Sequence, residues 1–115
     1  MPAEYRQLSN LFKILAHPLR LQILAMLSQG EECVCHMQAA LGKPQPYISQ
    51  QMAVLRDAGL VKDRKDGLNV FYSLKDAQVA HLLDAAFVER DGLSLAIRRG
   101  AIRGCPCPKC RAGRA

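Results

Sequence analysis

Residues 44–61 read PQPYISQQMAVLRDAGLV, and this stretch decides the fold. From Gln45 onward, the apolar residues Ile48, Met52 and Leu55 recur at i, i+4 and i+7. This spacing places them on one stripe of an α-helix, because each residue advances about 100° around the axis. The stretch therefore predicts a helix with one buried, apolar face.

Proline fits best at a helix start, and glycine suits the left-handed position that ends a helix. Pro44, Pro46 and Gly59 therefore bound this helix at both ends. Uncharged side chains that suit hydrogen bonding to base edges occupy its other faces; they are Gln45, Tyr47, Ser49, Gln50 and Gln51. We predict a DNA-reading helix; the alternative is an ordinary surface helix rich in glutamine.

Residues 37–41 form a short helical piece upstream, and Gly42, Lys43 and Pro44 close it. A short helix, a tight turn containing glycine and a longer helix with polar N-terminal residues make a helix-turn-helix.

A hairpin follows directly, because residues 61–65 and 69–73 flank Asp66-Gly67, a strong hairpin signal. Arg64 and Lys65 precede its tip, where basic side chains can contact phosphate or the minor groove. Following the reading helix, the hairpin is the wing of a winged helix; alone, it would be an ordinary solvated basic hairpin.

Three further helices surround this motif. Apolar residues predict a first helix that ends before His17-Pro18, a second that Pro18 opens at its favoured first position, and a last one over residues 76–90. The acidic residues Glu31 and Glu32, which follow the second helix, are expected to be solvated.

The chain has 115 residues, of which 50% are hydrophobic, so it supports one small domain with a modest core. We expect residues 1–92 to form a DNA-binding and dimerisation domain and residues 93–115 to form a basic, cysteine-rich tail. The first 93 residues carry 10 basic and 10 acidic side chains, so the net charge of +6 lies in the tail. That tail is either a mobile end or a source of salt-sensitive DNA affinity. No signal peptide or membrane span is recognisable, so a cytoplasmic location is expected.

Cys33 and Cys35 are two residues apart. In a regular helix they would point about 200° apart, whereas in an extended segment they face the same way. A metal held by both would therefore favour non-helical backbone at the start of the short helix. The alternative is two small apolar core residues.

The tail holds a second cluster, Cys105, Cys107 and Cys110, spaced by prolines. Three thiols can supply a trigonal As(III) site, and a tetrahedral Zn(II) or Cd(II) site would need a fourth ligand. The alternative is a disordered tail with incidental cysteines. Five cysteines in a reducing compartment favour free thiolates or metal ligands over structural disulfides.

The run LAHPLRLQIL, the Cys33-Val34-Cys35 pair, the helix LGKPQPYISQQMAVLRDAGLV and the strand VFYSL together resemble the ArsR/SmtB family of bacterial metal-responsive repressors. The resemblance covers roughly residues 8–90. It implies a homodimeric winged helix, mainly α with a β-hairpin wing, whose first and last helices pair across a two-fold axis. It also implies that the dimer holds double-stranded operator DNA until a metal or metalloid releases it.

Similar arsenic-responsive members carry a third cysteine where this chain has Gln38. The tail therefore either completes the Cys33 and Cys35 site or forms a separate one. The common cap serine and helix threonine are replaced here by Pro44 and Tyr47, which changes the expected operator sequence.

No enzyme motif competes with this interpretation. The sequence predicts a repressor with As(III) as inducer, and with Sb(III), Cd(II), Pb(II) or Zn(II) as further candidates. The alternatives are a thiol redox or persulfide switch of the same fold and a zinc-stabilised structural DNA-binding module.

Overall fold

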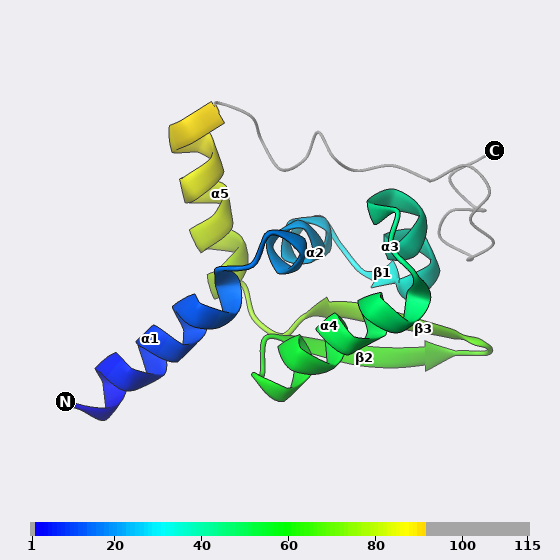
Figure 1. Cartoon of the computed structure of the whole chain (residues 1–115), viewed down its shortest axis with the longest axis horizontal. Helices are drawn as coiled ribbons and strands as arrows, with labels where there is room; N and C mark the ends of the chain where they lie inside the picture. Colours follow the sequence, from blue (N-terminus) through cyan, green and yellow to red (C-terminus); the bar gives the residue numbers. More distant parts are fainter. Residues whose placement is uncertain (1, 92–115) are drawn as a thin grey trace.

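The computed structural model of the chain describes residues 2–91, with side-chain burial up to residue 86. Five helices and three strands follow one another as α1 (Ala3–Leu15), α2 (Pro18–Ser28), β1 (Glu32–Cys33), α3 (Val34–Leu41), α4 (Gln45–Asp57), β2 (Val61–Asp66), β3 (Asn69–Leu74) and α5 (Gln78–Asp91) (Figure 1). The expected tail, with its three cysteines, lies outside the described residues. Within them, no single helix could cross a membrane; α1 and α2 reach the necessary length and hydropathy only together, and they meet at 95°.

The break between α1 and α2 forms as predicted. Pro18 opens α2, and His17 caps it, since the His17 Nδ1 atom accepts a hydrogen bond from the Arg20 backbone N–H at 3.4 Å. This bond satisfies one of the donors that every helix start leaves open. His17 therefore has a structural role at the start of α2.

The helix-turn-helix of α3 and α4 is confirmed. Gly42 ends α3 in the left-handed conformation, with φ of 65°, and its N–H donates to the Gln38 carbonyl at 2.9 Å. Pro44 then caps α4, with Pro46 in its first turn. A side chain at position 42 would meet no atom within 4 Å, so glycine is needed there for its backbone freedom alone.

The wing is also confirmed, as the antiparallel pair β2 and β3 joined at Gly67, whose φ is 63°. A third strand, which the sequence did not predict, completes the sheet in the order β1-β3-β2. In β1, Glu32 pairs with Tyr72 and Cys33 pairs with Phe71. The segment that carries the first cysteine is therefore attached to the wing.

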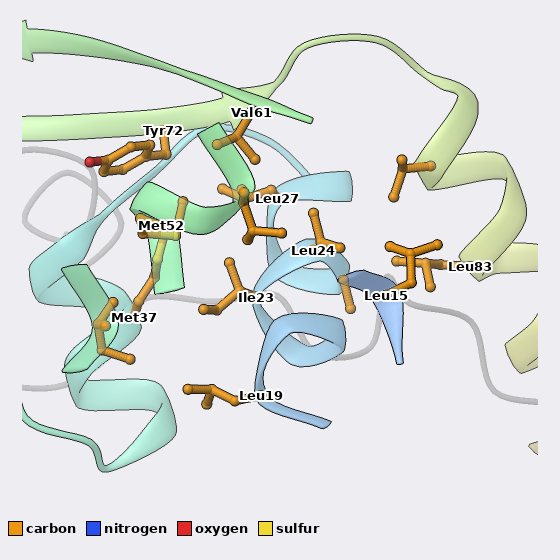
Figure 2. Packing of buried hydrophobic residues seen from close by; sticks show 14 residues of the cluster. Leu15, Leu19, Ile23, Leu24, Leu27, Met37, Met52, Val61, Tyr72 and Leu83 are labelled. Carbon is orange, nitrogen blue, oxygen red and sulfur yellow. The ribbon is translucent and has the colours of Figure 1, made fainter. Parts of the chain in front are cut away.

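The core gathers around α2, which runs between α3 and α4 on one side and α1 and α5 on the other (Figure 2). Ile23 and Leu24 of α2 are fully buried, and so is Met37 of α3. Burying one such side chain contributes about 1.5–3 kcal/mol. Because Met37 packs into the same cluster as the stripe of α4, the position of α3 and that of α4 depend on each other.

Candidate DNA-binding and thiol sites

The predicted reading helix, α4, is oriented by its apolar stripe. Ile48, Met52 and Leu55 are all 0% exposed, so this face of the helix is fixed against the core. Gln50 is exposed on the outer face. In the first turn, the Gln45 Nε2 atom donates to the Ser49 Oγ atom at 3.2 Å. Gln45 and Ser49 therefore lie together in the N-terminal part of α4.

Two other predicted DNA contacts are engaged inside the domain. The Gln51 Oε1 atom accepts a hydrogen bond from the Arg20 Nε atom at 2.9 Å, and the Arg20 Nη1 atom donates to the Ile14 carbonyl at 3.3 Å. Tyr47 is half-buried and packs against the core. Gln51 therefore links α4 to α2, whereas base contact by Gln51 and by Tyr47 stays a prediction.

The wing exposes both predicted basic residues, but Arg64 is folded back. Its Nη2 and Nε atoms lie 2.6 and 3.1 Å from the two carboxylate oxygens of Glu31. Its guanidinium carbon lies 4.9 Å from the centre of the Phe71 ring. The hydrogen bond to Glu31 raises the pKa of Arg64. Glu31 stays partly exposed, as expected, and its ion pair with Arg64 joins the residue before β1 to the wing.

Cys33 and Cys35 meet at the N-terminus of α3, where a disulfide joins them in this structure. Cys33 precedes the helix in extended backbone, with φ of −91° and ψ of 160°, and is 1% exposed. Cys35 lies in the first helical turn and is more exposed. Their Cα atoms are 5.4 Å apart. The non-helical backbone expected at the start of the short helix is present at Cys33, whereas a metal held by both residues stays a prediction.

The sulfur of Cys33 is also the cap of α3. It accepts a hydrogen bond from the His36 backbone N–H at 3.2 Å, a contact inside the protein interior. A helix N-terminus and an N–H donor both favour the thiolate form of a cysteine. The Cys33 sulfur is therefore both a candidate metal ligand and the cap of α3.

Glu32 and His36 flank this cysteine pair in the sequence. Both are buried, and the Glu32 Oε2 atom lies 3.4 Å from the His36 Nε2 atom. The expectation that Glu32 is solvated was wrong, because β1 pairing draws it into the interior. Across the part of the chain that the structure describes, no group of three His, Cys, Asp or Glu side chains could hold a metal.

The fold and this geometry define a winged-helix DNA-binding regulator. Residues 17–63 match the family described as bacterial regulatory protein, arsR family. Among curated relatives, the arsenical resistance operon repressor of Escherichia coli is 42% identical over 101 residues, covering 84% of this chain and 86% of that protein. A biofilm growth-associated repressor of Xylella fastidiosa is 37% identical over 87 residues, covering 76% of each.

Solved structures agree. Reduced HlyU from Vibrio cholerae superposes with a TM-score of 0.72 at 33% identity, covering 76% of this chain and 93% of that one. The homodimeric winged helix-turn-helix DNA-binding domain of Mb0332 from Mycobacterium bovis superposes with a TM-score of 0.70 at 34% identity, covering 77% and 82%. The chain belongs to the ArsR family, and it is a DNA-binding transcriptional repressor and not an enzyme.

Proposed function

We propose that this repressor binds operator DNA as a homodimer in the bacterial cytoplasm and is released when the thiolates of Cys33 and Cys35 bind As(III). The observation that carries the proposal is the meeting of both sulfurs at the N-terminus of α3. This helix packs against α4, the predicted reader of DNA bases. The E. coli relative, named as an arsenical resistance repressor, supports the same ligand.

The pair supplies two of the three sulfurs that trigonal As(III) takes. Cys105, Cys107 and Cys110 carry the thiols that could complete the site, either in the same chain or across the dimer. Sb(III) takes the same ligands, whereas Cd(II), Pb(II) and Zn(II) would need a different set or a fourth ligand. As(III) therefore ranks first among the soft ions.

The coupling between thiols and DNA runs through α3. When the Cys33 sulfur bonds to arsenic in place of the Cys35 sulfur, its position relative to the His36 N–H changes, so the cap at the first turn of α3 is altered. Met37 follows one residue later and is buried in the core cluster that holds α4. A shift of α3 would then change the position of α4 against the core. Couplings of this kind are about 1–3 kcal/mol.

Dimerisation is supported by α1. Its side chains Tyr5, Leu8 and Phe12 are 62%, 45% and 50% exposed, although together they form an apolar stripe. An exposed stripe of this kind is typical of a surface that another chain covers. In the dimer, α1 and α5 would provide the two-fold interface. The Mb0332 domain, which is described as homodimeric, supports dimer formation.

The test compares two variants of the reduced protein on labelled operator DNA, with fluorescence anisotropy as the readout of release. Cys33→Ser with Cys35→Ser is expected to bind DNA normally and to stay bound in arsenite. Serine at Cys105, Cys107 and Cys110 is expected to raise the arsenite concentration needed for release about tenfold or more, because one sulfur is missing. If arsenite fully released DNA from the Cys33→Ser, Cys35→Ser variant, arsenic sensing would be assigned to the tail cysteines instead.

A second candidate function rests on the disulfide itself. Two thiols and one hydrogen peroxide would give the Cys33–Cys35 disulfide and two waters, so the same pair could report oxidation. HlyU from Vibrio cholerae, a relative that is described in its reduced form, supports this second function. Release by peroxide but not by arsenite, in protein that keeps both cysteines, would favour this function over arsenic sensing.

A further inference from the structure

Arg20 lies in the first turn of α2 and reaches two other helices. The side chains of Leu19 and Ile23, on either side of it in the sequence, are buried in the core, so this turn of α2 is held in place. The Arg20 side chain is half-buried and donates hydrogen bonds to α1 and to α4. Its guanidinium therefore occupies a defined position between three helices.

One acceptor is the backbone carbonyl of Ile14, near the C-terminus of α1. In a continuous helix this carbonyl would accept from the N–H of residue 18, but Pro18 has no N–H. The Arg20 Nη1 atom donates to it instead, at 3.3 Å, and brings a positive charge to the negative end of α1. Arg20 therefore stabilises the end of α1 at its 95° break from α2.

The other acceptor is the side chain of Gln51 on α4. The Arg20 Nε atom donates to the Gln51 Oε1 atom at 2.9 Å. One arginine can serve both acceptors because its planar guanidinium presents several N–H donors in a rigid arrangement. A single side chain thus connects α1, which carries the exposed apolar stripe, with α4, the predicted reader of DNA bases.

This connection adds a restraint on α4 that apolar packing does not provide. The buried stripe of α4 holds the helix against the core, but the hydrophobic effect has no preferred direction. A hydrogen bond, in contrast, requires a given distance and angle. The Arg20 bond to Gln51 therefore restricts rotation and sliding of α4 along the core.

We propose that Arg20 is a positioning residue for operator recognition, which fixes α4 relative to α1 and so sets the distance between the two reading helices of the dimer. This proposal rests on the proposed homodimer, in which α1 belongs to the two-fold interface. The half-sites of an operator lie about 34–36 Å apart, one turn of DNA, and the two reading helices must match that distance. Gln51 then supports recognition through Arg20.

The first test compares Arg20→Met with Lys13→Met, which removes the same charge from an exposed position on α1, next to Ile14. Fluorescence anisotropy measures the affinity of each protein for operator and for unrelated DNA. Arg20→Met should lower the ratio of the two affinities about tenfold or more, whereas Lys13→Met should keep it within about twofold. An unchanged ratio in Arg20→Met would overturn the proposal.

The second test changes Gln51, which leaves the bond from Arg20 to α1 in place. Gln51→Glu keeps an acceptor for Arg20 and should keep the affinity ratio within about twofold, whereas Gln51→Ala should lower it about tenfold. Adding Arg20→Met to Gln51→Ala should cause no further loss beyond about twofold, because the two residues form one link. Equal losses in the two Gln51 variants would assign base contact to Gln51 and refute the link.

The third test varies the spacing of the operator half-sites. One added base pair shifts them by about 3.4 Å and rotates them by about 35°. The native chain should then bind about tenfold more weakly, whereas Arg20→Met and Gln51→Ala should each lose less than about threefold. An equal penalty in all three proteins would overturn the role of Arg20.

Sedimentation of the native chain on operator DNA separates this failure from failure of the proposed function. A monomer on DNA would refute the homodimer and the positioning role with it. A dimer whose variants show the native spacing penalty would refute the positioning role of Arg20 alone.

Discussion

The ion pair between Glu31 and Arg64 should restrain DNA binding, and Glu31→Gln should relieve that restraint. In the structure, both Glu31 oxygens hold the Arg64 side chain, at 2.6 and 3.1 Å. Arg64 must leave this carboxylate, or share it, to neutralise a DNA phosphate. Glutamine keeps the size of the side chain but removes the nearer of two negative charges; the other is Asp66, whose Oδ2 atom lies 3.9 Å from the Arg64 Nη1 atom.

The magnitude follows from counterion release. Each phosphate that a protein neutralises adds about 0.9 to the slope of log affinity against log salt, so one freed Arg64 per chain adds up to about 1.8 for a dimer. Between about 50 and 200 mM salt, the affinity of Glu31→Gln for DNA should therefore fall by roughly twelvefold more than that of the native chain. At low salt, Glu31→Gln should bind operator and unrelated DNA more tightly by similar factors, because phosphate contacts carry no sequence information.

Operator affinity is measured by anisotropy across a salt series for three proteins: the native chain, Glu31→Gln and Asp76→Asn. The control removes the same charge from an exposed position between β3 and α5, at the end of the hairpin opposite its tip. The control should leave the salt slope close to native. An unchanged or shallower slope in Glu31→Gln would refute the reasoning, since Arg64 would then make no phosphate contact.

Three further changes test other elements. Gln50→Ala should weaken specific operator binding by about 1–3 kcal/mol per lost base contact, whereas Gln22→Ala, at an exposed position of α2, should not; equal affinities would remove Gln50 from the reading surface. Phe12→Glu should raise the dimer dissociation constant about tenfold or more in sedimentation experiments, and Lys13→Glu, one residue further round α1, should do so less. Met37→Ala should lower the free energy of unfolding by about 2–5 kcal/mol, while Met37→Leu should cost less than about 1.5 kcal/mol; urea unfolding at one fixed protein concentration measures both.

The elements that the sequence predicted are those with a local signal. The stripe of Ile48, Met52 and Leu55 predicts α4 because its spacing follows the helical repeat. Gly42 and Gly67 mark the turns because only glycine adopts positive φ easily. These features depend on neighbours a few residues away, so they can be read directly from the chain.

The features that were missed depend on residues distant in sequence. Strand β1 has only two residues, too few for a period, and exists because Cys33 pairs with Phe71. Arg64 and Glu31 are 33 residues apart, so nothing local indicates that they form an ion pair. The extended backbone at Cys33, just ahead of α3, was expected from the spacing of the two cysteines, but its pairing with Phe71 of β3 was not.

The eight residues of α3 are too few to form a stable helix alone. Its first turn is held by a single side-chain acceptor, the Cys33 sulfur, which the His36 N–H contacts at 3.2 Å. Hydrogen exchange at that amide proton therefore depends on the chemical state of the sulfur, because exchange requires this contact to open. The protection of the His36 amide proton from exchange should therefore report whether the Cys33 thiol is free, oxidised or bound to arsenic, with no label attached to the protein.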